Sequence, residues 1–162
     1  MSIDPRAFRD ALGCFATGIC VAATLDAEGA PVGVTVNSVT SVSLNPPLLL
    51  FCLDRNAECH AAFMASDSFA LTVLATDQRA MSDNFARPPG PGRWDGVVWR
   101  AGITGSPMLD AGLAFLDCRR HAVHDGGDHT ILVGRVLGIA HRPEGDPLLY
   151  FRGAYRAIGP AP

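Results

Sequence analysis

The stretch GVTVNSVTSVSLNPPL, residues 33–48, contains the pattern that decides the fold of this chain. Apolar residues occupy even positions in two runs, 34–36 and 42–44, with polar residues between them. A period of two is typical of a β-strand with one buried face, and the interruption at residues 38–40 indicates a bend. The stretch therefore predicts a strand, a bend and a second strand. Its hydroxyl and amide groups fit either an ordinary surface strand or the wall of a site for a polar planar ligand.

Further strand signals lie on both sides of this stretch. ICVAAT (19–24) precedes it across a DAEGAP turn, so the two segments are expected to form a hairpin. LLLFCL (48–53) is a continuous apolar run, which predicts a strand buried on both faces. The remaining expected strands are FALTVL (69–74), VVWRA (97–101), residues 113–124 and 129–140 joined by Asp125-Gly126-Gly127-Asp128, and LLYFRGAYRAI (148–158).

The first helix signal stands at the start of the chain. Asp4-Pro5 combines a residue that caps helices with a proline at the first helical position. Phe8, Leu12 and Phe15 follow at helical spacing, so we expect an amphipathic helix of about three turns that ends at Gly18.

Two shorter helices and one long loop are expected further along the chain. Asn56 precedes AECHAAFM (57–64) as a candidate cap, and Asp77 precedes a helix that runs to about Phe85. The segment RPPGPGRWDG (87–96) is rich in proline and glycine and must be a loop, either a mobile flap at the rim of a site or a plain connector.

The order of these elements predicts the fold class. At least seven strands and two or three short helices occur with little strand–helix alternation, which argues against a doubly wound parallel sheet. We expect a mainly β protein, with a closed or partly closed antiparallel barrel and helices packed on it. No repeat or internal boundary interrupts residues 1–162, so the chain is expected to form one domain.

Composition excludes several classes of function. The net charge is −3 and no cluster of Lys or Arg is present, so a nucleic-acid partner is not expected. No apolar stretch approaches the ~20 residues that span a bilayer, and no basic flank with an apolar run starts the chain. The five cysteines are an odd number without a CxxC motif, which favours the reducing cytoplasm.

A metal site is the competing interpretation of one segment. Cys118, His121, His124 and His129 lie close together in the sequence. In a strand, however, Cys118 and His121 point to opposite faces, and so do His121 and His124, whereas metal ligands must converge. We therefore expect no metal.

Candidate chemistry is concentrated in three segments. The sequence contains no GxSxG, GxxxxGK[ST] or GxGxxG motif, so neither a hydrolase elbow, a P-loop nor a Rossmann site is indicated. The candidates are residues 35–43, the turn Gly127-Asp128-His129-Thr130, and Asn84-Phe85-Ala86-Arg87. Each also has a purely structural interpretation: His129 as part of a turn, Phe85 as core, and Arg87 as a solvated charge.

Taken together, these segments resemble a known family. The collinear stretches FRDALGCFATGICVAAT, GVTVNSVTSVSLNPPL, DQRAMSDNFA, GGDHTILVGRV and DPLLYFRGAYRAI look like those of the small flavin reductases. These are the NAD(P)H-dependent reductase components of two-component flavin monooxygenases, such as the phenol and 4-hydroxyphenylacetate hydroxylases. The resemblance implies an FMN-binding split β-barrel, a cytoplasmic homodimer with flavin sites near the subunit interface, and a separate flavin-dependent monooxygenase that receives reduced flavin.

The resemblance also assigns residues to ligands. It implies that FMN or FAD is bound by Thr35, Val36, Asn37, Ser38, Ser41, Val42, Ser43, Asn56, Ala57, Phe85, Ala86 and Arg87. The first seven lie where the family contacts the flavin ring and ribityl chain. It places NADH or NADPH at His129, Arg152 and Tyr155. Relatives often carry a hydroxyl or a charge at position 57, where this chain has alanine.

The chemistry implied by the resemblance needs no acid–base residue. A hydride passes between two stacked cofactor rings, and the protein supplies geometry and electrostatics. His129 is expected to position the nicotinamide without serving as an obligate proton donor. Two other functions fit the same fold: a flavin-bound electron carrier and a flavin-bound ferric reductase.

Overall fold

The protein is built on one seven-stranded antiparallel sheet. The computed structural model describes residues 3–87, 90 and 92–159. The strand order is β3-β2-β6-β9-β10-β5-β4, and every neighbouring pair is antiparallel. These strands are β2 (Cys20–Leu25), β3 (Pro31–Val36), β4 (Thr40–Leu44), β5 (Pro47–Asp54), β6 (Ser68–Val73), β9 (Ala114–Gly126) and β10 (His129–His141). The prediction of a mainly β, antiparallel split barrel is confirmed.

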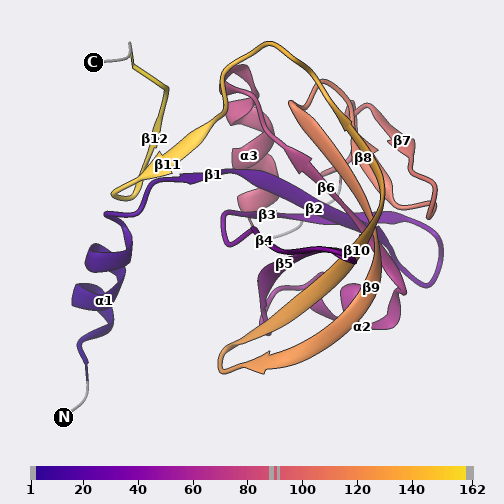
Figure 1. The fold of residues 1–162 in the computed structure, drawn as a ribbon, viewed down its shortest axis with the longest axis horizontal. Helices are drawn as coiled ribbons and strands as arrows, with labels where there is room; N and C mark the ends of the chain where they lie inside the picture. Colours follow the sequence, from indigo (N-terminus) through magenta and orange to yellow (C-terminus); the bar gives the residue numbers. More distant parts are fainter. Residues whose placement is uncertain (1–2, 88–89, 91, 160–162) are drawn as a thin grey trace.

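Two small sheets and three short helices complete the described chain. One sheet contains β1 (Thr17–Gly18), β11 (Leu149–Phe151) and β12 (Ala154–Arg156), and the other pairs β7 (Trp99–Ala101) with β8 (Pro107–Leu109). The helices are α1 (Pro5–Leu12), α2 (His60–Ala65) and α3 (Arg79–Ala86), the last preceded by the 3-10 turn Thr76–Gln78. Figure 1 shows α1, β11 and β12 together as an arm beside the main sheet. No helix in the described ranges is long and apolar enough to cross a membrane.

The core consists of two clusters on the main sheet. In the first, Phe51 packs edge-on against Phe63 and Phe69, with ring centroids 5.7 and 5.1 Å away. The second cluster contains Phe85 and Leu109, which are 1% and 0% exposed. Burial of these apolar side chains is the main favourable contribution to folding.

The first helix is shorter than predicted. Asp4 caps it as expected, since its Oδ1 accepts a hydrogen bond from the Arg6 N–H at 3.1 Å. The helix ends at Leu12, because the Gly13 N–H closes the last turn on the Arg9 carbonyl and the chain then changes direction. Gly18, predicted as the end of the helix, instead lies in β1.

Neither predicted cap of the later helices is correct. Asn56 lies in a turn in which its own N–H donates to Asp54 Oδ1 at 2.8 Å, and α2 begins only at His60. Asp77 lies inside the 3-10 turn that precedes α3.

Two strand predictions are also corrected. β5 alternates between buried and partly exposed residues, because only one of its faces covers the core. The segment 148–158 forms two strands, β11 and β12, since a tight turn at Arg152 and Gly153 reverses the chain. Both turn residues have positive φ, +49° and +74°, and glycine adopts that conformation without steric cost.

Candidate functional site

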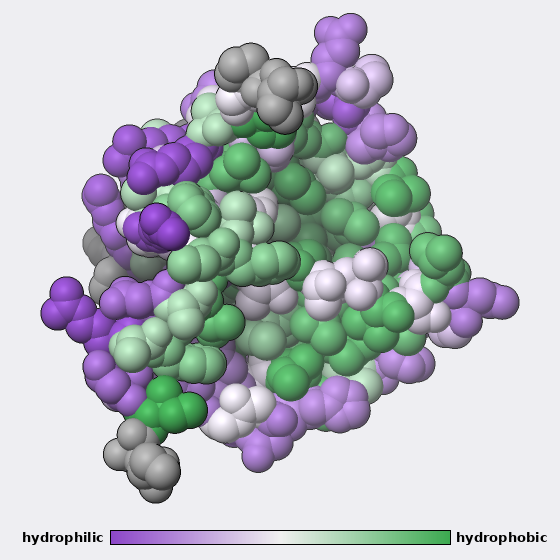
Figure 2. All heavy atoms as spheres, turned by 60° about the vertical axis from the view of Figure 1, so that its left-hand side comes forward, coloured by the Kyte–Doolittle hydropathy of each residue, from purple (hydrophilic) through white to green (hydrophobic). Residues whose placement is uncertain are grey.

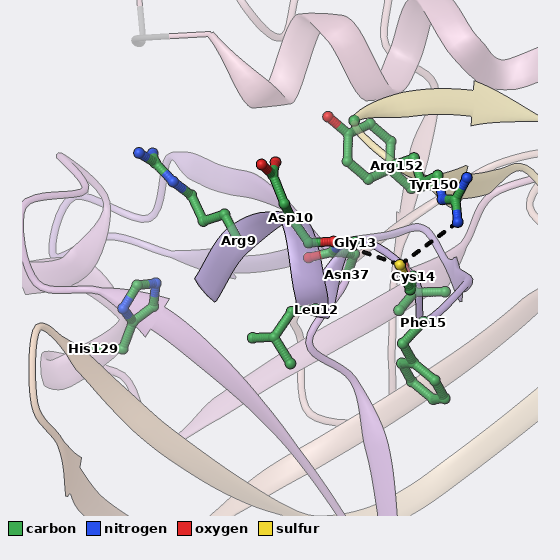
Figure 3. A pocket seen from close by; sticks show the side chains of 12 residues that line it. Arg9, Asp10, Leu12, Gly13, Cys14, Phe15, Asn37, His129, Tyr150 and Arg152 are labelled. Carbon is green, nitrogen blue, oxygen red and sulfur yellow. Dashed lines mark hydrogen bonds between the residues drawn. The ribbon is translucent and has the colours of Figure 1, made fainter. Parts of the chain in front are cut away.

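A cleft of about 1080 Å³ lies between the arm and the main sheet. Asn37 and His129 line it from the sheet, and the other lining residues come from the arm (Figure 3). The arm residues are Arg9, Asp10, Leu12, Gly13, Cys14, Phe15, Thr17, Tyr150, Arg152 and Gly153. Two of the predicted segments, the bend after β3 and the start of β10, therefore meet at one cavity.

His129 is the first residue of β10, directly after the two-residue turn Gly127-Asp128. Its Nδ1 lies 2.8 Å from Asp128 Oδ1, and its side chain is 42% exposed. The hydrogen bond from His129, and next its charge when protonated, lower the pKa of the Asp128 carboxyl. Asp128 therefore holds the ring by one nitrogen and leaves Nε2 available to a ligand.

The bend between β3 and β4 is present where the sequence predicts it. Asn37 is exposed at the cleft, whereas Ser38 is used to fix the bend: its Oγ accepts from the Cys52 N–H at 2.9 Å and donates to the Cys52 carbonyl at 3.2 Å. Thr35 donates to the Ser82 carbonyl at 2.7 Å, and Val36 is 7% exposed in the core. The side chains of these three residues therefore have structural roles.

The second half of the predicted flavin wall remains accessible. Ser41 and Val42 are exposed on β4, and Ser43 is partly exposed. A bulge between Ser41 and Ser43 shifts the register against β5. Such bulges re-aim side chains near sites.

Asn56 and Ala57 lie in the turn after β5, at the opposite end of this strand from the residues that pair with Ser41 and Ser43. Asn56 is exposed, and its amide donates to Asp54 Oδ1 at 3.2 Å. Ala57 packs against the first core cluster and offers no polar side chain. A phosphate here would depend on Asn56 and on backbone N–H groups.

Phe85, Ala86 and Arg87 do not form the predicted second wall of the cleft. The ring of Phe85 is enclosed in the second core cluster, with Trp94 against it at 4.9 Å between centroids, so neither of its faces meets solvent. Ala86 and Arg87 are exposed at the end of α3 and do not line the cleft. The structure gives the Phe85 ring a role in the core, and the flavin contacts of Phe85, Ala86 and Arg87 stay predictions.

Arg152 and Tyr155 occupy different places. Arg152 lines the cleft, with Nη2 donating to Cys14 Sγ at 3.8 Å (Figure 3). Tyr155 lies outside the lining, and its hydroxyl donates to Asp83 Oδ1 at 2.8 Å and lies 3.0 Å from Ser82 Oγ. Burial is the main cause of its raised pKa. The position of Tyr155 therefore supports a structural role, and its contact with the nucleotide stays a prediction.

Sequence reasoning missed the residues that the arm brings to the cleft. Arg9 and Asp10 come from α1, and Tyr150 comes from β11. The polar face of the amphipathic helix was a signal that could have pointed to Arg9 and Asp10. Nothing in the local sequence could show that residues 9 and 150 meet.

The residues considered as a competing metal site do not converge. Cys118 is fully buried in the first core cluster, whereas His121 and His124 are exposed on β9. Within the described ranges, no three His, Cys, Asp or Glu side chains are grouped as metal ligands.

Comparison with known proteins decides the family. Residues 12–159 match the flavin reductase like domain. The chain belongs to this family. The flavin reductase chain is 46% identical over 151 residues to the FMN reductase (NADH) SmoA of Agrobacterium fabrum, covering 93% of this chain and 84% of the relative. It is 41% identical over 159 residues to HsaB, the reductase subunit of a flavin-dependent monooxygenase of Rhodococcus jostii, covering 98% and 80%.

Solved structures give the same result for this flavin reductase. The nitrilotriacetate monooxygenase component B homologue of Mycobacterium thermoresistibile is 40% identical with a TM-score of 0.90, over 95% of this chain and 86% of that one. The NADH:FAD oxidoreductase SgcE6 of Streptomyces globisporus, in complex with NAD and FAD fragments, is 34% identical with a TM-score of 0.90, covering 99% and 98%. The predicted resemblance to flavin reductases is confirmed.

Proposed function

We propose that this protein is an NADH-dependent flavin reductase that supplies reduced FMN or FAD to a separate flavin-dependent monooxygenase. The observation that carries the proposal is the meeting of Asn37 and His129 at one large cleft. The relatives support it by their names: SmoA is an NADH-dependent FMN reductase, and HsaB is a monooxygenase reductase subunit.

The bend and β4 provide the flavin side of the site. Asn37, Ser41 and Ser43 offer polar side chains, and the backbone of the bend offers N–H groups to the ring edge. Asn56 and Ala57 lie where the phosphate or ribityl chain is expected. When bound, the flavin supplies a ring that accepts a hydride from the nicotinamide.

The hairpin and the arm provide the nucleotide side. His129 positions the nicotinamide, and Asp128 fixes the orientation of its ring through the 2.8 Å contact. Arg9 and Arg152, both at the cleft, are cations suited to the phosphates of NADH. The chain's contribution is to hold two flat rings in contact and to keep water out.

A second copy of the chain is the proposed occupant of the apolar face beside the arm. No residue of α1 is buried, and Phe8, Leu12 and Phe15 are 53%, 59% and 75% exposed. Figure 2 shows hydrophobic residues gathered around a hollow on this face. Isolated exposed apolar residues are ordinary, but a gathered set is typical of an interface. A homodimer would cover these side chains and place the cleft at the subunit boundary.

We further propose that residues 1–162 act as one domain in the cytoplasm. The family match and the seven-stranded sheet both extend over most of the chain. The five cysteines are free thiols, as is usual in a reducing compartment.

The test is steady-state oxidation of NADH and NADPH with added FMN or FAD. Turnover that depends on free flavin, and that is faster with NADH, supports the proposal. Turnover without added flavin would favour a bound electron carrier, and NADH-dependent iron reduction that exceeds flavin turnover would favour a ferric reductase. If neither NADH nor NADPH is oxidised with either FMN or FAD, the proposed activity is contradicted.

A further inference from the structure

Arg55 connects the turn after β5 to the hairpin tip that precedes His129. Its Nε donates to the Gly127 carbonyl at 2.9 Å, and its Nη2 donates to Asp125 Oδ1 at 2.7 Å. Its backbone N–H donates to the Asp128 carbonyl at 3.1 Å. Arg55 thus contacts three residues of the tip, at positions 125, 127 and 128, all within four residues of His129.

A second connection holds the hairpin on the other side of His129. The His60 Nε2 lies 2.9 Å from the hydroxyl of Thr130, which is only 3% exposed. Between these two connections, His129 itself pairs across the sheet with Asp54. The segment 54–60 therefore determines where His129 stands.

The tip needs such a connection because the sheet ends there. The ladder between β5 and β10 stops at Asp54 and His129, so Gly127 and Asp128 extend beyond β5. An isolated two-stranded tip is only marginally stable in water. Since the Arg55 and Asp125 side chains are 46% and 80% exposed, their ion pair contributes little to global stability. The Arg55–Asp125 ion pair instead fixes the local geometry of the hairpin tip.

We propose that Arg55 is a positioning residue, which sets His129 relative to the flavin site. The turn that contains Arg55 also contains Asn56 and Ala57, the residues assigned to the flavin. The two ligand sites are thereby built on one connected unit, and the distance between the two rings depends on it. This inference rests on the proposed role of His129.

The test compares Arg55→Ala and Arg55→Lys with the wild type in NADH oxidation with FMN. Lysine retains the charge but cannot reach both the Gly127 carbonyl and the Asp125 carboxylate with the fork of a guanidinium. Both variants should raise the KM for NADH by about tenfold and change the KM for FMN by less than twofold. Arg142→Ala, an exposed arginine beyond the opposite end of β10, is the control and should change neither.

Two further variants show whether Arg55 acts through the hairpin. Asp125→Ala removes one of the partners of Arg55 and should reproduce part of the rise in the KM for NADH. In the double variant with Arg55→Ala, the KM for NADH should rise by less than the product of the two single fold-changes. In a His129→Ala background, Arg55→Ala should change the KM for NADH by less than twofold. Circular dichroism verifies that each variant is folded.

The possible outcomes distinguish the positioning role of Arg55 from the proposed role of His129. A full Arg55→Ala effect in the His129→Ala background overturns the positioning role and leaves His129 in place. An equal rise in the KM for FMN also overturns it, because Arg55 would then be a direct flavin ligand. If His129→Ala alone leaves the kinetics unchanged, the proposed role of His129 fails, and the positioning role fails with it.

Discussion

His129 Nδ1 and Asp128 Oδ1 lie 2.8 Å apart at the rim of the cleft. Because the pKa of Asp128 is lowered, its carboxylate is charged throughout the neutral range and accepts a hydrogen bond from the Nδ1–H group of His129. In the proposed role of His129, the outward nitrogen Nε2 is then the atom that meets the nicotinamide nucleotide.

Replacing this imidazole should weaken the use of NADH. We expect His129→Ala to lower kcat/KM for NADH by about tenfold, with the flavin KM within a factor of two, because the residue orients only the nucleotide. Stopped-flow measurement of NADH oxidation at fixed FMN checks this. His124→Ala, an exposed histidine on β9, should leave both parameters unchanged. Wild-type kinetics in His129→Ala would contradict the assignment.

The buried thiols predict a loss of stability at alkaline pH. Burial raises the pKa of both Cys20 and Cys118 to about 12 from an ordinary value of 9.0. Between these values the unfolded chain releases protons that the folded chain retains, so stability falls as pH rises. Each thiol lowers the free energy of unfolding by about 1.4 kcal/mol per pH unit above pH ~9.

Urea unfolding at several pH values measures this slope. Cys118→Ala should lower the slope by about one thiol's share, ~1.4 kcal/mol per pH unit. The matched control is Cys14→Ala, whose thiol is exposed in the arm and should leave the slope unchanged. An equal slope in the wild type and Cys118→Ala would show that Cys118 ionises freely in the folded protein.

Gly134 is a position where no side chain fits. A Cβ there would overlap the ring of Phe69 and lie 2.9 Å from Cys118 Cβ, next to a register shift in the β9–β10 pair. Gly134→Ala should therefore cost about 1–3 kcal/mol in the free energy of unfolding. Gly18→Ala is the control, since no atom of the described chain, apart from Gly18 and its two neighbours, lies within 4 Å of its Cβ position. Equal denaturation midpoints would contradict this account of the packing.

The apolar side of α1 predicts the oligomeric state. Phe8→Asp should convert a dimer into a monomer in sedimentation velocity, while near-ultraviolet circular dichroism stays the same, because no residue of α1 is buried in its own subunit. Arg6→Asp makes a larger change in charge on the opposite side of the helix and should leave the dimer intact. A monomeric wild type would contradict the proposed dimer.

The Tyr155 hydroxyl predicts a structural effect without a kinetic one. Tyr155→Phe removes the hydrogen bonds to Asp83 and Ser82 that fasten β12 to α3, at a cost of about 1–2 kcal/mol. Tyr150→Phe, whose hydroxyl makes no hydrogen bond to the described part of the chain, should cost little. The KM for NADH should be unchanged in Tyr155→Phe, and a tenfold rise would return Tyr155 to the nucleotide site.

Local pattern predicted the strands well and the ends of the helices poorly. The alternation in residues 33–48 gave both strands and the bend correctly, because a period of two is a property of neighbouring residues. Asn56 was a wrong cap because Asp54, two residues earlier, accepts the hydrogen bonds of that turn. Two side chains of similar capping chemistry compete there, and only the fold shows which is used.

Phe85 illustrates the limit for site residues. An aromatic residue at the end of a helix fits a ligand wall and a core equally well. Phe85 is buried because Gly33 of β3 and Trp94 of the loop after α3 pack against its ring, and neither residue belongs to the helix that carries it. Asn37 and His129 were predicted at the site, and both line the cleft. Arg55 was overlooked because its partners lie about 70 residues away.

The sequence by itself determined an antiparallel β protein of the flavin reductase family, with its bend, its long hairpin and His129 next to the turn. The strands, the bend and the hairpin arise from alternation and turn chemistry among neighbouring residues, whereas the family follows from the resemblance of the collinear segments. Only the tertiary structure decided which side chains face the cleft. The sheet order brings β10 beside β5, and the small sheet brings β11 beside β1. One cavity is thereby lined by residues 9, 10, 12–15, 17, 37, 129, 150, 152 and 153. Such long-range contacts depend on how strands pair across the whole chain, which no local pattern contains.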